Sequence, residues 1–461
     1  MEALNDLNPA NMGAVGRARC LPGTRVQVLV DLFLALTHPN PENKIIWLHG
    51  PTGSGKSTIL NTLARCLRKL DRQGAFLFFD QNDRDNSDPC RVISTLAHQL
   101  ARFHPIFAEK ILSQIQTWPG ITESSLDAQF RRLIQDPLTA IAKTDDWGPI
   151  IIVLDALDEC GTTVSRKPLL KALLNLTKLP KMFRLLIASR DEPKTTPSLD
   201  TKRLSIPVDN GKSSDIELFR SALADVATYP IKVRSALSDI NLLFRRWLSR
   251  NADVFVNLGL PPDWPGGHII EQLVAQSEGL FSWASTAIRF IESDFPEERL
   301  KAVLIASAHG MSRIGLDDLY QVVLTHQFSS YNASELKVAH SILGAIVVSG
   351  KRLSDQQLSR LLGVAVGKVQ DVLFRLHPVL RWARGRPVQL LHSSFTDFLC
   401  DPTRCQDPQW RININVSAPD LASTSQRAAI YGRENMEFDS FGPQPTVDVR
   451  NSHIPHSGLF H

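Results

Sequence analysis

Cysteine, methionine and tyrosine are scarce in this chain of 461 residues, which contains 6, 5 and 4 of them. The cysteines are widely separated except for Cys400 and Cys405, so the sequence argues against a disulfide framework and against a zinc ribbon. A chain that does not depend on disulfides suits a reducing compartment, and we expect a cytoplasmic protein.

Long hydrophobic runs are also missing. The two longest, residues 26–36 and 279–291, are interrupted by Asp31 and Arg289 and are shorter than the roughly 20 residues that a membrane span needs. The opening residues, MEALNDLNPANMG, resemble neither a secretory signal nor a transit peptide. We therefore expect no membrane partner.

Neither sign of charge is in large excess, because 51 Lys and Arg face 47 Asp and Glu, which gives a net charge of +4. This small excess argues against nucleic acid as the main partner, and Arg381, Arg384 and Arg386 are interpreted as a solvated turn. Hydrophobic residues, in contrast, make up 43% of the chain. That content is enough for full cores, and the length predicts two to four domains.

Five short apolar runs alternate with amphipathic segments between residues 45 and 207. They are IIWLH (45–49), AFLFF (75–79), PIIIVL (149–154), FRLLIA (183–188) and RLSI (203–206), and helices are expected at 56–70, 89–103, 105–117 and 126–143. Buried parallel strands have this pattern, because the helices that connect them cover both faces of the sheet. The sequence predicts an α/β domain with a parallel sheet and flanking helices.

The pattern becomes helical from about residue 213 to 310, with a proline-rich break at 260–267. Four more helices are expected at 316–327, 334–347, 355–362 and 366–376, followed by two short strands around Gly385. Helices followed by a hairpin indicate a winged-helix domain. From residue 406 to 461 the chain is polar and rich in Pro, Ser and Asn, which predicts disordered or weakly docked residues.

These patterns divide the chain into five expected parts. They are a short N-terminal segment (1–24), the α/β domain (25–212), an all-helical domain (213–310), a winged-helix domain (311–405) and an irregular C-terminal tail (406–461). The sequence contains no internal repeats.

GPTGSGKS, residues 50–57, satisfies the full P-loop pattern and lies between a predicted strand and a predicted helix, as that motif requires. Its glycines let backbone N–H groups surround phosphates at a helix N-terminus, where the helix dipole favours negative charge. The candidate nucleotide-binding residues are Gly50, Pro51, Thr52, Gly53, Ser54, Gly55, Lys56, Ser57 and Thr58. Lys56 is expected to neutralise the β- and γ-phosphates, and the Ser57 hydroxyl to ligate Mg²⁺. The alternative is a glycine-rich turn without a ligand.

IIIVLDALDEC, residues 150–160, is a hydrophobic strand that delivers Asp155 at its carboxyl end, the edge at which open α/β sheets bind ligands. Asp155 is therefore the candidate Walker B ligand of Mg²⁺. Asp158 and Glu159 follow it and are candidates for orienting or deprotonating the water that attacks the γ-phosphate. The alternative for these carboxylates is a solvated acidic strand exit.

Arg190 ends the next predicted strand, in FRLLIASRDEP. From there its guanidinium could make a bidentate contact with the γ-phosphate, and we include it among the candidate catalytic residues. An ion pair with Asp191 or Glu192 is the alternative.

In these motifs the chain resembles the NACHT-type P-loop NTPases of the STAND class, in their fungal, nephrocystin-like branch. The resemblance covers about residues 20–405 and rests on CLPGTR (20–25), IIWLHGPTGSGKST, IIIVLDALDEC, LLIASRDEP, DWPGGHIIEQLVAQSEGLFSWASTAIRFI (263–291), LDDLY (316–320) and LLHSSFTDFL (390–399). It implies a molecular switch whose domains close around ADP and open and self-associate when ATP replaces it. Carried over by position, it implies the roles given above for the P-loop, Asp155 and the acidic pair, and a sensor role for Arg190.

His392 matches the histidine of the winged helix that contacts the nucleotide β-phosphate in related proteins. The alternative is a histidine that only caps the last helix. The chain also departs from the family pattern, because Gly279-Leu280-Phe281 stands where some branches carry Gly-x-Pro, so we assign no adenine contact there. About 20 residues precede CLPGTR and no repeat array follows residue 405, so we expect a switch core that acts with unidentified effector and sensor proteins.

The leading hypothesis is an ATP/ADP-binding switch with slow, Mg²⁺-dependent hydrolysis of ATP or GTP, in signal transduction or fungal incompatibility. Three alternatives stay open from the sequence alone. The chain could be a scaffold that binds nucleotide without hydrolysing it, a truncated gene product, or a P-loop kinase of small molecules. The LDALDE strand and the two helical domains argue against the kinase.

Overall fold

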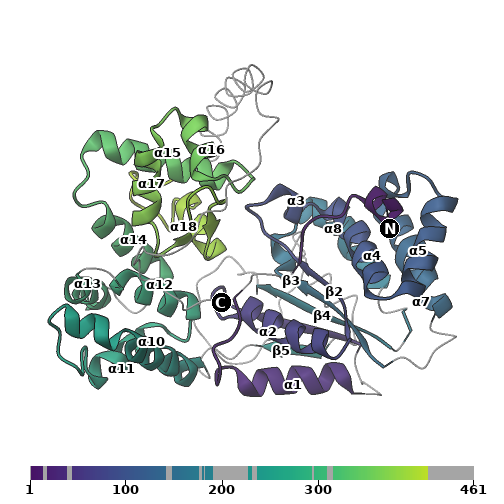
Figure 1. Ribbon diagram of the computed structural model, residues 1–461, viewed down its shortest axis with the longest axis horizontal. Helices are drawn as coiled ribbons and strands as arrows, with labels where there is room; N and C mark the ends of the chain where they lie inside the picture. Colours follow the sequence, from purple (N-terminus) through teal and green to yellow (C-terminus); the bar gives the residue numbers. More distant parts are fainter. Residues whose placement is uncertain are drawn as a thin grey trace, which may run out of the picture. The chain divides into compact units, whose positions relative to one another are not determined.

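Figure 1 shows the computed structural model, which describes residues 2–13, 18–38, 44–141, 148–175, 179–180, 182–190, 227–230, 236–292, 295–308 and 315–413. The chain divides into two compact units. The first contains Met1–Leu242 and Glu278–Phe281, and the second contains Leu243–Ser277 and Ser282–His461. We call them the first and the second unit.

The first unit is built on a five-stranded parallel sheet with the strand order β2-β3-β4-β1-β5. The strands are β1 (Ile45–Gly50), β2 (Gln73–Phe78), β3 (Ile150–Asp155), β4 (Phe183–Arg190) and β5 (Ala227–Pro230). The register places Gly50 of β1 beside Arg190 of β4, and Phe78 of β2 beside Asp155 of β3. The carboxyl ends of these strands therefore meet at one edge of the sheet, and the predicted α/β class is confirmed.

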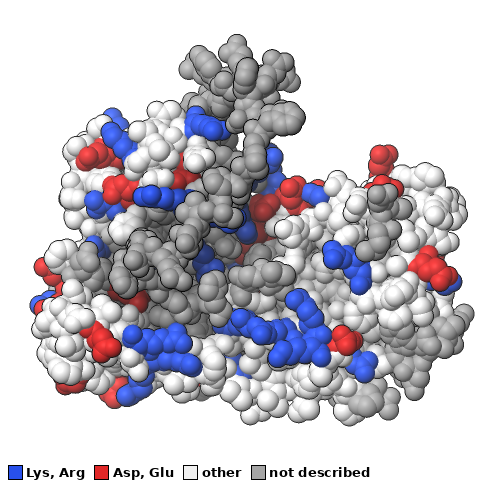
Figure 2. Space-filling model, viewed as in Figure 1, with Lys and Arg blue, Asp and Glu red and all other residues white. Residues whose placement is uncertain are grey.

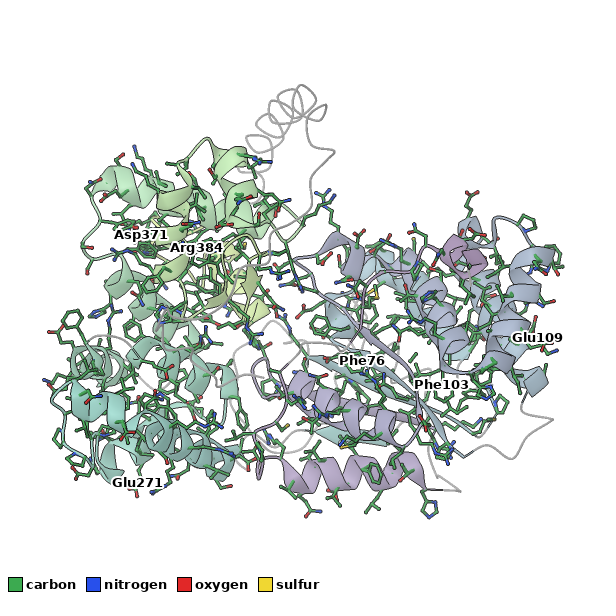
Figure 3. All side chains as sticks on the ribbon, in the orientation of Figure 1. Phe76, Phe103, Glu109, Glu271, Asp371 and Arg384 are labelled. Carbon is green, nitrogen blue, oxygen red and sulfur yellow. The ribbon has the colours of Figure 1, made fainter. Side chains whose placement is uncertain are left out.

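Helices cover both faces of this sheet (Figure 1). One face packs against α1 (Val26–Thr37) and α2 (Lys56–Lys69), and the other packs against α4 (Val92–Phe103), α5 (Pro105–Thr117) and α8 (Thr163–Leu174). Alternate strand residues point to opposite faces, so Ile151 and Val153 lie in the cluster under α1 and α2, whereas Ile152 lies in the other. Figure 3 labels Phe76, which belongs to the first cluster, and Phe103, which packs against the second.

Short segments complete the connections of the first unit. They are α3 (Arg84–Ser87), η2 (Pro89–Arg91), η3 (Ile121–Glu123), α6 (Leu126–Phe130), η4 (Arg131–Gln135), α7 (Asp136–Ile141) and η5 (Leu157–Glu159). The sequence predicts one helix over 126–143, but the segment η4 is a π-helical turn between two α-helical pieces. Pro137 follows this turn and has no N–H to donate to the preceding turn, which accounts for the irregular winding.

The N-terminal residues contribute to the core of the first unit. The segment η1 (Glu2–Leu7) places Leu4 and Leu7 in the cluster of α4 and α5, together with Met12. The Met12 carbonyl accepts a hydrogen bond of 3.0 Å from the N–H of Phe78, at the end of β2. The first part of the predicted 1–24 segment is thus bound to the sheet domain.

The edge strand β5 falls in a stretch for which the sequence predicts helices. It pairs in parallel with β1, from Ile46 beside Ala227 to His49 beside Pro230. ATYP has no apolar run, and its position depends on backbone hydrogen bonds with β1. A proline is tolerated in such an edge strand. The strand predicted at 203–206 lies outside the described residues.

The second unit contains the remaining helices. They are α10 (Leu237–Asn257), α11 (Gly267–Gln276), α12 (Phe281–Ile291), α13 (Pro296–Ala308), α14 (Leu316–Gln327), α15 (Ala333–Val348), α16 (Asp355–Leu362), α17 (Val366–Arg375) and α18 (Ser393–Cys400). The start of α10, up to Leu242, and the first residue of α12, Phe281, still belong to the first unit. The expected hairpin is present as β6 (Leu380–Arg381) and β7 (Gln389–Leu390), with Gly385 at a φ of 70° in the turn.

Residues 406–413 begin the segment that is predicted to be disordered or weakly docked, and they pack against the preceding helices through buried side chains. Trp410 and Ile412 are both 1% exposed, and the Trp410 ring lies 5.0 Å from that of Phe328. The N–H of Ile412 donates to the Leu399 carbonyl at 2.8 Å. Two isolated apolar side chains anchor this segment, and such anchors leave no periodic pattern in the sequence. Residues 414–461 lie outside the described part of the chain.

Basic and acidic side chains occur together on the face shown in Figure 2, in keeping with the small net charge of +4. Among the described helices, none combines the length and the hydropathy needed to cross a membrane.

Candidate functional site

The P-loop connects β1 to α2, as the motif predicts. Gly53 and Gly55 have φ values of 83° and 89°, in the left-handed region that glycine adopts without strain. Ser54 between them is fully buried, and its N–H donates to the Pro51 carbonyl at 3.3 Å. The loop therefore ends at the N-terminus of a 14-residue helix, where unpaired N–H groups and the helix dipole favour an anion.

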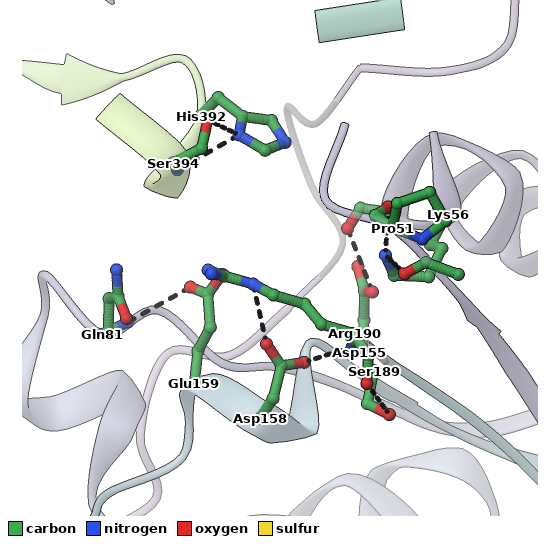
Figure 4. Close-up of polar contacts among 12 residues, drawn as sticks. Pro51, Lys56, Gln81, Asp155, Asp158, Glu159, Ser189, Arg190, His392 and Ser394 are labelled. Atoms are coloured by element: carbon green, nitrogen blue, oxygen red, sulfur yellow. Dashed lines mark hydrogen bonds and ion pairs between the residues drawn. The ribbon is translucent and has the colours of Figure 1, made fainter. Parts of the chain in front are cut away.

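The Lys56 side chain lies over its own loop (Figure 4). Its Nζ donates to the carbonyls of Gly50 and Pro51, at 2.8 and 3.0 Å. Thr58, one turn into the helix, donates its hydroxyl to the Gly55 carbonyl at 2.7 Å. An ammonium group is thus placed beside the loop whose N–H groups can bind phosphate, although it pairs with carbonyl oxygens here.

The two predicted Mg²⁺ ligands lie in contact. Ser57 Oγ donates to Asp155 Oδ1 at 3.1 Å, although the two residues are 98 positions apart. Asp155 ends β3 and is 1% exposed, so the strand fixes the position of its carboxylate. A hydroxyl and a carboxylate are hard oxygen donors of the kind that Mg²⁺ accepts in addition to phosphate and water, so this pair fits the predicted metal.

The three candidate catalytic side chains form one ion-paired cluster (Figure 4). Arg190 Nε lies 2.9 Å from Asp158 Oδ2, and Arg190 Nη2 lies 3.0 Å from Glu159 Oε1. The main-chain N–H of Arg190 also donates to Asp158 Oδ1 at 3.0 Å. A turn with Ala156 at a φ of 58° directs the acidic pair toward β4. The sequence left open an ion pair of Arg190 with Asp191 or Glu192, and both of those lie outside the described residues.

Arg166 on α8 is a site residue that the sequence analysis missed. It is 5% exposed, and its guanidinium donates to the carbonyls of Asp158, Cys160 and Gly161 at 2.5, 2.7 and 3.1 Å. These bonds hold the loop that carries the acidic pair. Burial raises the pKa of the neighbouring Cys160 thiol to about 12, so that thiol stays protonated and does not act as a nucleophile at neutral pH.

Replacing Arg166 with alanine is expected to lower the free energy of unfolding of the first unit by about 2–4 kcal/mol, because three carbonyls lose a buried charged donor. Urea unfolding followed by tryptophan fluorescence measures this loss. Lys167→Ala, which removes an exposed cation from the next position, is the control and should change stability by less than about 0.5 kcal/mol. Equal midpoints for the two variants would show that Arg166 does not stabilise the loop.

His392 lies in the second unit, directly before α18. Its Nδ1 accepts the N–H of Ser394 at 3.2 Å and lies 2.6 Å from Ser394 Oγ, which is 2.8 Å from Tyr320 Oη. The capping role that the sequence leaves as the alternative for His392 is therefore present. The motifs LDDLY and LLHSSFTDFL meet in this chain of hydrogen bonds. Because Nδ1 accepts a main-chain N–H, the neutral ring carries its proton on Nε2, and an Nε2–H is a donor that suits a phosphate oxygen.

Comparisons with solved structures yield weak likenesses. A Walker-type ATPase of Pyrococcus abyssi is 12% identical, with a TM-score of 0.37, over 83% of this chain and 97% of that one. Cdc6p of Pyrobaculum aerophilum is 11% identical, with a TM-score of 0.33, over 90% of this chain and 97% of that one. At such TM-scores neither likeness supports an inference about this chain.

Comparisons of sequence are more informative. The family described as Nephrocystin 3, N-terminal, matches residues 30–190, which contain β1 to β4 and end at Arg190. The vegetative incompatibility protein HET-E-1 of Podospora anserina is 21% identical over 375 residues, which are 75% of this chain and 26% of that protein. This chain thus spans about a quarter of the length of that curated relative. These two matches support the resemblance to NACHT-like P-loop NTPases that the motifs predict.

Proposed function

We propose that this chain is a nucleotide-dependent switch that binds ATP or ADP at its P-loop and hydrolyses ATP slowly in the presence of Mg²⁺. One observation supports this proposal above all. The ends of β1, β3 and β4 bring the P-loop, the Ser57–Asp155 contact and the cluster of Asp158, Glu159 and Arg190 to one edge of the sheet. Phosphate binding, metal binding and chemistry at a γ-phosphate all need to occur at one place.

The P-loop would hold the phosphates through the backbone N–H groups around Gly53 and Gly55 and through the Lys56 ammonium. Ser57 and Asp155 would hold Mg²⁺, which when bound neutralises charge on the phosphate oxygens. GTP offers the same phosphates, so nucleotide preference depends on contacts to the base.

The ion-paired cluster suggests how ATP and ADP could be told apart. Arg190 lies between two carboxylates, and an arginine that contacts a γ-phosphate has to weaken at least one of these pairs. Asp158 or Glu159 would then be available to orient water, and neither change is expected with ADP. The difference between the two nucleotides would thus arise at Arg190, and a ligand shifts a conformational equilibrium only through such a difference.

We propose for this switch the domain organisation that the sequence leads us to expect, with a nucleotide-binding part at 25–212, a helical part at 213–310 and a winged helix at 311–405. We propose that it self-associates with ATP in the cytoplasm and acts with effector and sensor proteins in signal transduction. The relation to a vegetative incompatibility protein supports a role in fungal incompatibility.

Light scattering of the purified chain tests the switch. With ADP and Mg²⁺ we expect a monomer of 51.3 kDa, and with a non-hydrolysable ATP analogue and Mg²⁺ a larger assembly. The Lys56→Ala variant is the matched control, since it should stay monomeric in both solutions. A mass that does not depend on nucleotide in the wild type would favour a scaffold.

Replacing His392 with alanine is expected to speed the release of ADP about tenfold or more and to leave ATP affinity nearly unchanged. The reason is the loss of an Nε2–H donor to the β-phosphate in the closed state, and a hydrogen bond to a charged group contributes about 1.5–3 kcal/mol. Stopped-flow release of a fluorescent ADP analogue measures this rate.

The capping role of His392 requires a matched control. His392→Asn keeps a side-chain acceptor for the Ser394 N–H, because asparagine is a good N-cap, but it lacks the imidazole donor. We expect this variant to keep the thermal stability of the wild type and to release ADP as fast as the alanine variant. If both variants released ADP at the wild-type rate, the role of His392 would be limited to capping α18.

A further inference from the structure

Arg25, the last residue of CLPGTR, has a conformation that is uncommon for a residue with a side chain. It precedes α1 with a φ of 56° and a ψ of 22°, in the left-handed region, and it is 4% exposed. A buried arginine in this region persists only when surrounding contacts fix it. Those contacts connect the P-loop with the starts of α10 and α12.

The first contact is with the P-loop. Arg25 Nη2 donates to the Ser54 carbonyl at 2.8 Å. The Ser54 carbonyl and the Gly55 N–H belong to one planar peptide group, so a bond that fixes the carbonyl also fixes the direction of that N–H. Arg25 therefore orients one of the backbone donors that a P-loop offers to phosphate, without itself needing to reach the nucleotide.

The second set of contacts is with the starts of α10 and α12. The Arg25 N–H donates to Asp239 Oδ2 at 3.1 Å, and Arg25 Nε lies 3.9 Å from the same oxygen. The guanidinium carbon lies 5.0 Å from the centre of the Phe281 ring. Burial lowers the pKa of Arg25 below its usual value, and the Asp239 carboxylate opposes this shift.

Both contacted segments lie where the chain passes between the two units. The first unit includes the chain up to Leu242 and again Glu278–Phe281. The neighbouring backbone packs closely against the same segments, since a Cβ at Gly23 would lie 3.3 Å from the Leu242 side chain and one at Gly55 would lie 3.6 Å from Phe281. Arg25 thus contacts the phosphate-binding loop and the entrance to the helical region at the same time.

We propose that Arg25 is a positioning residue that couples the P-loop to the first turn of α10. Nucleotide that orders the Ser54–Gly55 peptide strengthens the contact of Arg25 with Asp239, and loosening that contact weakens nucleotide binding, because coupling between two sites is reciprocal. This inference rests on the proposed nucleotide binding and adds the route by which binding affects the segment that leads into the helical region.

Hydrogen exchange of the full chain with and without ADP and Mg²⁺ tests the coupling. In the wild type, ADP is expected to slow exchange both in residues 50–58 and in residues 237–242. Arg25→Met keeps the length and the apolar body of the side chain but removes the guanidinium. At saturating ADP this variant should keep the slowing at 50–58 and lose it at 237–242, with an affinity for ADP lowered about tenfold. Arg65→Met, the same change on the exposed face of α2, should behave as the wild type.

The possible results separate the coupling from the binding. The coupling would be overturned if ADP still slowed exchange at 237–242 in Arg25→Met. It would also be overturned if saturating ADP no longer slowed exchange at either segment of this variant, because Arg25 would then only support the loop. Slowing at 50–58 alone in the wild type would overturn it too. A wild type without slowing at 50–58 would instead contradict nucleotide binding itself.

A second variant keeps the test decisive if Arg25→Met does not fold. Asp239→Asn retains an acceptor for the Arg25 N–H and leaves the Arg25–Ser54 bond in place, but it removes the charge that attracts the guanidinium. We expect at least a twofold smaller ADP response at 237–242 with an unchanged response at 50–58. An unchanged response at both segments would contradict the proposal.

Discussion

Replacing Lys56 with alanine is expected to weaken the binding of ATP and of ADP at least about 100-fold. The ammonium group of Lys56 lies within 3.0 Å of two loop carbonyls, beside N–H groups that can bind phosphate. Removing a charged donor from a phosphate costs about 1.5–3 kcal/mol per hydrogen bond, and 2.7 kcal/mol is about 100-fold in affinity. Titration calorimetry with Mg²⁺ present measures the loss directly.

Thermal melting gives an independent measure of the same change. At a ligand concentration of about 100 times Kd, nucleotide stabilises the folded wild type by about 2.7 kcal/mol, and the same concentration should stabilise the Lys56 variant by less than about 0.5 kcal/mol. Lys69→Ala, an exposed lysine at the other end of α2, is the matched control and should respond as the wild type. If Lys56→Ala bound nucleotide as tightly as Lys69→Ala, GPTGSGKS would be a glycine-rich turn without this function.

Replacing Asp158 with asparagine is expected to reduce ATP turnover about 10²–10⁴-fold while ATP affinity stays within a few-fold of the wild type. Asparagine can still accept the main-chain N–H of Arg190, but it lacks the charge that pairs with the Arg190 guanidinium and that orients or deprotonates water. Single-turnover release of labelled phosphate measures the chemical step apart from product release.

Two further variants make this result specific. Glu159→Gln, measured in parallel, shows which carboxylate contributes more, because both pair with Arg190 in the structure. Glu109→Gln on the exposed surface of α5, labelled in Figure 3, controls for the loss of one negative charge and should leave turnover unchanged. Tight ATP binding in the wild type without measurable turnover would identify the chain as a non-hydrolysing scaffold.

The elements around the candidate site that the sequence predicts correctly are those defined by local spacing. The P-loop and the Asp155 strand each combine a continuous apolar run with a fixed motif, and a short apolar run flanked by turn residues is sufficient to locate a buried strand. For this reason β1, β2, β3 and β4 occur within two residues of their predicted bounds. The contact of Ser57 with Asp155 follows, because parallel strands end at one edge.

The contacts that the sequence does not predict are those of arginines over long distances in the chain. Arg25 and Arg166 can be buried because their guanidinium groups donate to backbone carbonyls. Every residue has such a carbonyl, so the sequence does not show which of them an arginine will bind. Arg190 was placed at the right strand end, but its pairing with Asp158 and Glu159 depends on how β3 and β4 adjoin. The edge strand β5 was missed for a similar reason, since its position depends on the backbone of β1.

The measurement that tests the central claim most directly is the identity and amount of nucleotide released when the purified wild-type chain is denatured. Chromatography of the supernatant should detect close to one ADP per chain, and the Lys56→Ala variant, purified in the same way, should release almost none. A folded wild type that releases no nucleotide and gains no thermal stability from added ADP and Mg²⁺ would contradict the claim that this chain is a nucleotide-dependent switch.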